Sequence, residues 1–305
     1  MTAVSFRASE SANKRKTYLL LVGMGALVWV VVYAALTYFG TSTVGIVPIA
    51  VGIALVAVWG SYYSADTLVM RMTGARVIEQ SDNPNLFNLI QEVTIASGLP
   101  MPKVAIVEDD APNAFATGRN PEHAVIGFTT GILRVMDRDQ LQGVVAHEMS
   151  HVGNRDTLVS AVAATTAGAI AVLSDIMIRM MWFGGGRRGG RDSNSNPITL
   201  IISLVVLILA PVAALLLKSA ISRRREALAD ATAVAFTRNP AGLRSALEVL
   251  AANSTVVHQR STAVAHIWIE SPLDSKSVSR LFATHPPMEE RIAALRAMES
   301  LGPAT

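Results

Sequence analysis

The feature that most limits how this chain can fold is a run from Thr17 to Ala65 that contains no charged residue. A helix needs about 20 apolar residues to cross the hydrocarbon core of a bilayer, so this run is long enough for two passes. Small and polar residues at 40–43 interrupt it, which predicts a hairpin of two transmembrane helices at about 18–39 and 44–63. A cleaved signal peptide is the alternative, but its apolar region covers only about 7–15 residues.

Composition and charge agree with a membrane protein that also has a soluble part. Hydrophobic residues make up 51% of the chain and charged residues only 16%, against about 25% in an average soluble domain. Basic side chains flank the hairpin and its connecting turn has none; they are Arg7, Lys14, Arg15, Lys16, Arg71 and Arg76. The positive-inside rule therefore predicts that residues 1–16 and the segment from 66 onward are cytoplasmic. A net charge of +3 without an aromatic-interleaved basic patch argues against a nucleic-acid partner.

A second apolar pair occupies residues 157–221, with segments at about 157–181 and 197–217. The linker at 182–196 is rich in glycine and arginine, and an external loop should be poor in arginine. We interpret it as a solvated linker that can touch anionic lipid, in preference to an RNA-binding segment. A shallow hairpin or a buried helical pair is an alternative to full spans, but we expect about four transmembrane helices in all.

The remaining residues, 66–156 and 222–305, are predicted to form an α+β, mainly helical, domain. Capping signals at Asn83–Pro84 and at Asp137 with Gln140 predict two helices in the first part, the former closed by Gly98. Three short strands are expected between them, at Lys103–Val107, Ala114–Thr117 and Ala124–Phe128. In the second part, Asn239–Pro240 and Pro286–Pro287 are expected to open two further helices.

The second of the capped helices carries the sequence His147-Glu148-Met149-Ser150-His151. Residues four apart lie on one face of a helix, so both imidazoles can reach one zinc ion, and Glu148 can act on a water at the metal. The alternative is a helix with two hydrogen-bonded polar histidines. The chain has no cysteine, so a thiolate zinc site and a cysteine nucleophile are excluded.

A catalytic zinc site needs a third protein ligand and groups that orient its histidines. Glu226 and Asp230 form an ExxxD sequence in a helix-compatible stretch. Glu226 can supply the third ligand, and Asp230, one turn later, can hydrogen-bond the second ring nitrogen of a ligand histidine. The ExxxD pattern is common on surface helices and becomes informative only after an HExxH.

Four motifs in this order resemble the HtpX family, bacterial membrane zinc peptidases related to the eukaryotic CAAX prenyl protease. They are HEMSH at 147–151, SRRREALAD at 222–230, NAFATG at 113–118 and THPP at 284–287. The resemblance implies a gluzincin-type peptidase in the bacterial cell membrane, with one zinc ion per chain held by His147, His151 and Glu226. It also implies that Glu148 is the general base and acid, and that misfolded or damaged membrane proteins are the substrates.

The resemblance further assigns residues around the substrate. Asn113, Ala114, Phe115 and Ala116 would line the cleft, where a peptide would pair by strand addition. An ordinary edge strand is the alternative for this segment. His285 would donate to the oxyanion, with Arg291 assisting; a helix-capping histidine and a surface arginine are the competing interpretations.

Both ends of the second apolar pair lie close to zinc residues along the chain. His151 precedes Thr157 by six residues, about 9 Å of helix, and Glu226 follows Leu217 by a similar distance. The site should therefore lie just above the cytoplasmic membrane surface and favour segments that emerge from the bilayer.

Three different functions compete with this interpretation. A transporter would place ionisable residues inside its spans, which the first two segments lack. An inactive scaffold could retain the motif, although the intact Glu148 argues against it. A CAAX-type peptidase is similar in its chemistry but has more membrane spans than the four expected here.

Overall fold

The computed structural model describes residues 43–158, 223–253, 268–269 and 287–300, with scattered positions between 15 and 33. The helices are α2 (Thr43–Thr73), α3 (Pro84–Ser97), α4 (Thr130–Val135), α5 (Arg138–Gly153), α8 (Arg223–Thr237), α9 (Pro240–Ala252) and α10 (Met288–Ser300), with a 3-10 turn at Pro121–His123. The strands are β1 (Arg76–Ile78), β2 (Lys103–Val107), β3 (Ala114–Thr117) and β4 (Val125–Thr129). This is the mainly helical α+β fold that the sequence predicts.

The described part of the chain contains no helix with the length and apolar content needed to cross a membrane. The predicted spans at 157–181 and 197–217, with their linker, lie outside the described residues apart from Thr157 and Leu158, and most of 18–39 does too. The expected segment 44–63 is helical, but α2 continues ten residues further, to Thr73. It ends only at Gly74, whose φ of 68° is the left-handed conformation that closes many helices.

The four strands form one sheet in the order β1-β2-β4-β3. The central pair, β2 and β4, is parallel, while β1 and β3 are antiparallel to their neighbours. Strand β4 follows β3 in the chain but lies between β3 and β2, so β3 is an edge strand. It packs against α5, which carries the HExxH sequence.

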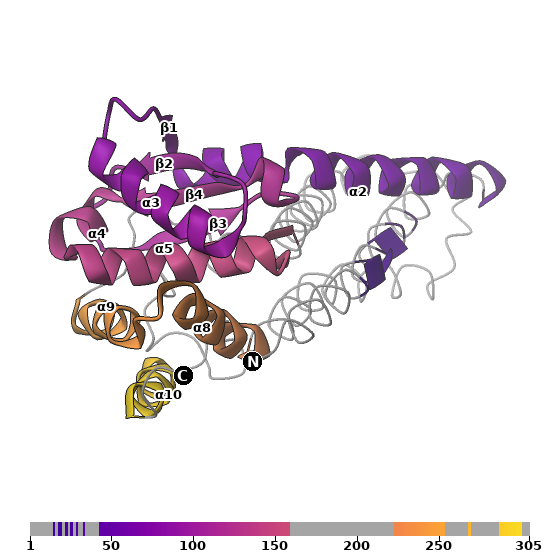
Figure 1. The fold of residues 1–305 in the computed structure, drawn as a ribbon. Helices are drawn as coiled ribbons and strands as arrows, with labels where there is room; N and C mark the ends of the chain where they lie inside the picture. The colour runs from indigo at the N-terminus through magenta and orange to yellow at the C-terminus, as the bar shows by residue number, and fades with distance from the viewer. Residues whose placement is uncertain are drawn as a thin grey trace, which may run out of the picture.

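Helix α5 is the centre of the fold. Figure 1 shows it lying between the sheet on one side and α8 and α9 on the other. Val144, Val145 and Met149 of α5 are buried in the main core, which also includes Ile126 of β4 and Leu247 of α9. The second half of the helix is enclosed on both sides, so its polar side chains His147, Glu148 and Ser150 are buried too.

Local sequence signals account for most of these elements. Asn83 caps α3 through Leu86 N–H, and Gly98 ends it at φ 68°. Asp137 and Gln140 form the predicted capping box of α5, and Asn239 caps α9. The third strand was expected at Ala124–Phe128 and lies one residue later. Strand β1 and helix α4 are too short to leave a periodic pattern and were not predicted.

Gly143 permits the close approach of α5 to α9. A Cβ at this position would lie 2.7 Å from the backbone Cα and N of Leu243, so α9 would have to move. We expect Gly143→Ala to lower the free energy of unfolding by about 1–3 kcal/mol, the usual cost of overpacking. Denaturant unfolding measures this. Gly60→Ala in α2, where the added Cβ meets nothing within 4 Å, is the control and should not destabilise the protein. Equal stability of both variants would contradict the prediction.

Candidate metal centre and active site

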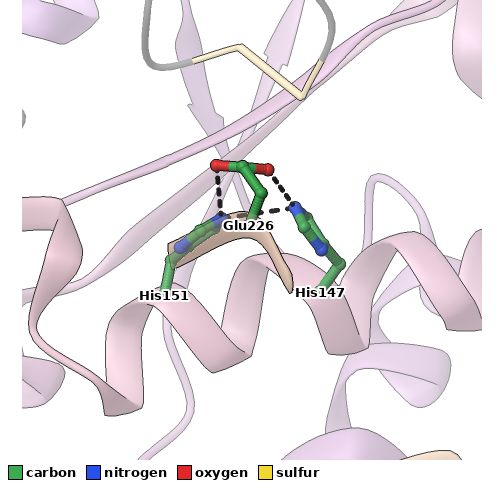
Figure 2. A group of neighbouring side chains, drawn as sticks. All are labelled: His147, His151 and Glu226. Atoms are coloured by element: carbon green, nitrogen blue, oxygen red, sulfur yellow. Dashed lines mark hydrogen bonds and ion pairs between the residues drawn. The ribbon is translucent and has the colours of Figure 1, made fainter. Parts of the chain in front are cut away.

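The sequence HEMSH lies in the last two turns of α5, with His147 and His151 on the same face (Figure 2). The capping box fixes where the helix begins and therefore which residues face α8. Glu226 lies in the first turn of α8 and directs its carboxylate at both imidazoles. His147 and Glu226 are buried, and His151 is partly exposed. Two helices far apart in sequence thus place three ligand-type side chains in one cluster.

The distances within this cluster are short and similar. His147 Nε2 lies 3.2 Å from His151 Nε2 and 3.5 Å from Glu226 Oε2, while His151 Nε2 lies 3.7 Å from Glu226 Oε1. Atoms that bind a tetrahedral zinc ion at about 2.0–2.2 Å lie about 3.3–3.6 Å from one another. The nitrogen and oxygen donors and their spacing therefore fit a metal ion with three protein ligands. A position is left over for water or substrate, as in catalytic sites.

Asp230 and Arg291 support the cluster from behind His147. Asp230 Oδ1 lies 2.9 Å from His147 Nδ1, and the Arg291 guanidinium donates to both Asp230 oxygens, at 2.7 and 2.9 Å. Burial alone would raise the pKa of Asp230, but the Arg291 charge and hydrogen bonds from His147 and Arg291 lower it to about 2. Asp230 is thus an ionised carboxylate that fixes the ring of His147, with Nε2 facing the site.

Glu148 is 2% exposed and follows His147 on α5, but it is not one of the three clustered ligands. Burial raises the pKa of its carboxyl, and the nearby His147 and His151 partly oppose this shift. A carboxylate with a raised pKa beside a metal cluster is suited to accept and return a proton at neutral pH.

Arg291 was predicted to assist the oxyanion, with a surface arginine as the alternative. The surface alternative is wrong, because Arg291 is 3% exposed and donates a hydrogen bond to Asp230. One guanidinium nitrogen also lies 3.5 Å from Glu226 Oε2. His285 lies outside the described residues.

The predicted cleft segment, Asn113–Ala116, is buried and contributes to edge strand β3. Its outer edge is partly covered: Phe115 forms an antiparallel bridge with Trp268, and Ile269 N–H donates to Ala114 C=O at 2.8 Å. The rings of Phe115 and Trp268 meet edge to face at 5.0 Å. Sequence reasoning missed Trp268, since no local pattern links it to β3.

Asp156 was also missed. It lies just beyond α5, is 3% exposed, and places Oδ2 3.2 Å from His151 Nδ1. In the sequence, Asp156 could have been noticed only as a single carboxylate five residues after His151.

Binding of a metal here is expected to release a proton. Burial would lower the pKa of His147, but hydrogen bonds with Asp230 and Glu226 outweigh it and raise this pKa to about 9. A ligand imidazole must be neutral, so at pH 7 the metal displaces that proton, and affinity should rise about tenfold per pH unit up to pH 9. Calorimetry of zinc binding in buffers of different ionisation enthalpy should show about one proton released. Asp230→Asn should reduce this number; zinc binding without proton release would contradict the pKa.

Comparison with known proteins agrees with the site. The model of peptidase family M48 matches residues 80–299. The chain is 43% identical over 291 residues to a protease HtpX homolog of Thermoanaerobacter pseudethanolicus, covering 95% of this chain and 96% of that one. It is 44% identical over 292 residues to a protease HtpX homolog of Streptococcus gordonii, covering 94% and 98%. The crystal structure of S. mikatae Ste24p is similar with a TM-score of 0.49 and 17% identity, over 94% of this chain and 67% of that one.

An HExxH helix with a downstream glutamate in this geometry defines a metal-dependent peptidase. The chain belongs to peptidase family M48 and is a metalloprotease of the HtpX type. The resemblance found in the sequence is thereby confirmed.

Proposed function

We propose that this chain is a zinc-dependent endopeptidase of the bacterial cell membrane that removes misfolded or damaged membrane proteins by cutting their cytoplasmic segments near the bilayer. The observation that carries the proposal is the cluster of His147, His151 and Glu226, whose separations of 3.2–3.7 Å suit a tetrahedral ion. Two imidazoles and one carboxylate are a typical donor set for catalytic zinc.

Different residues of this chain carry out different steps of peptide hydrolysis. A zinc ion at this cluster would lower the pKa of a water toward about 7 and polarise the scissile carbonyl. Glu148 takes the proton of the attacking water and returns it to the leaving amine. His285 stabilises the oxyanion, a role that rests on the THPP motif alone. Asp230 keeps His147 oriented throughout.

The peptide substrate adds to the outer edge of β3, in antiparallel pairing. Thr129 N–H donates to Asn113 C=O, so in alternation the backbone groups of Ala114 and Ala116 point to the outer edge. Ala114 C=O already accepts from Ile269, and Ala114 N–H donates to the Asn113 side chain. The bridge between Phe115 and Trp268 covers the edge around Ala114 and Ala116, so we expect the substrate to pair beyond this bridge, toward Gly118.

Membrane attachment is supported by the charge-free run at 17–65 and by α2. Apolar side chains on this helix face outward, among them Leu55, Val56 and Trp59, the last 68% exposed. Exposed apolar surface of this extent is unusual on a soluble domain and is expected on a lipid-facing helix. We propose that 17–65 forms a transmembrane hairpin, that 157–181 and 197–217 form a second pair, and that both peptidase parts are cytoplasmic.

The test is metal-dependent cleavage by the detergent-solubilised full chain. The substrate is a model membrane protein with an unfolded cytoplasmic tail, and casein serves as a soluble comparison. We expect about one zinc per chain, loss of cleavage after chelation, and recovery when zinc is added back. Cleavage that persists without metal would overturn the zinc mechanism. Cut sites far from the membrane ends would overturn the proposed substrate position.

A further inference from the structure

We propose that Asp156 is a second positioning residue of the metal centre: it holds His151 as Asp230 holds His147, and through Arg225 it links His151 to the helix that carries the third ligand. The inference rests on the proposed zinc peptidase function and extends it to residues that no HExxH or ExxxD pattern includes.

The chain path beyond α5 brings Asp156 back to the site. Helix α5 is capped at Asn154, whose N–H bonds Ser150 C=O at 2.9 Å. Arg155 then adopts φ 59°, a left-handed conformation uncommon for a residue with a side chain. Its N–H bonds Val152 C=O at 3.1 Å, and Asp156 begins a new helical stretch. This reversal turns the Asp156 side chain back over the last turn of α5, where His151 lies.

The contact with His151 repeats the contact on the other histidine. Asp156 Oδ2 lies 3.2 Å from His151 Nδ1, and Asp230 Oδ1 lies 2.9 Å from His147 Nδ1. Both aspartates are buried, with at most 4% of each residue exposed. In each case the carboxylate accepts from Nδ1, so Nε2 is the nitrogen that faces the candidate metal position, and the two Nε2 atoms lie 3.2 Å apart. A carboxylate behind a ligand imidazole fixes its tautomer and ring orientation.

The second oxygen of Asp156 reaches the other ligand helix. Arg225 Nη1 lies 3.6 Å from Asp156 Oδ1, and Arg225 immediately precedes Glu226 in α8. One carboxylate therefore links His151 on α5 with the residue next to the third ligand. The adjoining Thr157 hydroxyl donates to Gly118 C=O at 3.0 Å, which joins the same turn to the end of β3. The turn at 154–157 thus connects the two ligand helices and the substrate strand.

The test measures zinc affinity by chelator competition with the full chain in detergent. We expect Asp156→Asn to bind zinc about 10-fold more weakly and Asp156→Ala about 10–100-fold more weakly. Arg225→Met leaves the contact between Asp156 and His151 in place, so it should weaken zinc binding only a few-fold. The visible spectrum of the cobalt-substituted protein should change in Asp156→Asn, because the orientation of His151 changes. A purely structural role would alter thermal stability without changing that spectrum.

Asp110→Asn is the matched control, since Asp110 forms an exposed ion pair with Arg134. It should leave zinc affinity and the cobalt spectrum unchanged. Wild-type affinity and spectrum in folded Asp156→Asn would overturn the inference while leaving the proposed function intact. If Asp156→Ala does not fold, Asp156→Asn decides the question. Failure of the unmodified chain to bind zinc would instead overturn the proposed function itself.

Discussion

Glu148→Gln is expected to bind zinc as tightly as the unmodified protein and to lose proteolysis by about 10³-fold. The amide has the size of the carboxylate but cannot accept a proton, and positioned acid–base groups typically contribute 10²–10⁴-fold. Glu148 lies beside His147, 2% exposed and outside the ligand cluster, so its replacement leaves the metal donors in place. Initial rates on the model membrane substrate and metal content of the purified protein measure the two effects.

The matched control is Glu92→Gln, which makes the same change in an exposed ion pair with Arg138. It should retain full activity and zinc. Undiminished cleavage by Glu148→Gln would remove Glu148 from the role of base. Loss of zinc in that variant would show instead that Glu148 helps to hold the metal.

The candidate metal ligands could be predicted from sequence because the relation between the two histidines is local. His147 and His151 are one helical turn apart, and the capping box at Asp137 and Gln140 sets where that helix begins. The distance between His151 and Glu226 is not encoded locally; it follows from the packing of α5 against α8. Only the ExxxD motif indicated which glutamate completes the cluster.

The ExxxD motif predicted the contact of Asp230 with a ligand histidine. The other supporting contacts could not be predicted, because they join elements that are distant in sequence or depend on an unusual backbone turn. Trp268 meets Phe115 through a single bridge, which leaves no periodic signal. Asp156 reaches His151 only because Arg155 is left-handed. Arg291 was predicted to be near the chemistry, but the bidentate contact with Asp230 depends on how α10 packs against α8.

Arg291→Ala is expected to lower the free energy of unfolding by about 1.5–3 kcal/mol, because it removes two buried hydrogen bonds from the Asp230 carboxylate and leaves His147 as its partner. Zinc affinity should fall as well, by about 10–100-fold, since Asp230 orients His147. Denaturant unfolding of the metal-free protein in detergent measures stability apart from metal binding. The control is Arg296→Ala in the same helix, which breaks an exposed ion pair with Glu248 and should cost at most about 1 kcal/mol.

Arg291→Lys separates a positioning role from a substrate contact. Lysine keeps the charge but cannot donate to both Asp230 oxygens in the planar arrangement of a guanidinium, so stability and zinc affinity should both stay below those of the unmodified protein. If Arg291 instead served the substrate alone, both variants would bind zinc and unfold normally, and only KM or kcat would change. Full stability and zinc content in Arg291→Ala would therefore return Arg291 to the predicted role of assisting the oxyanion. Asp230 would then be an anion stabilised by His147 alone.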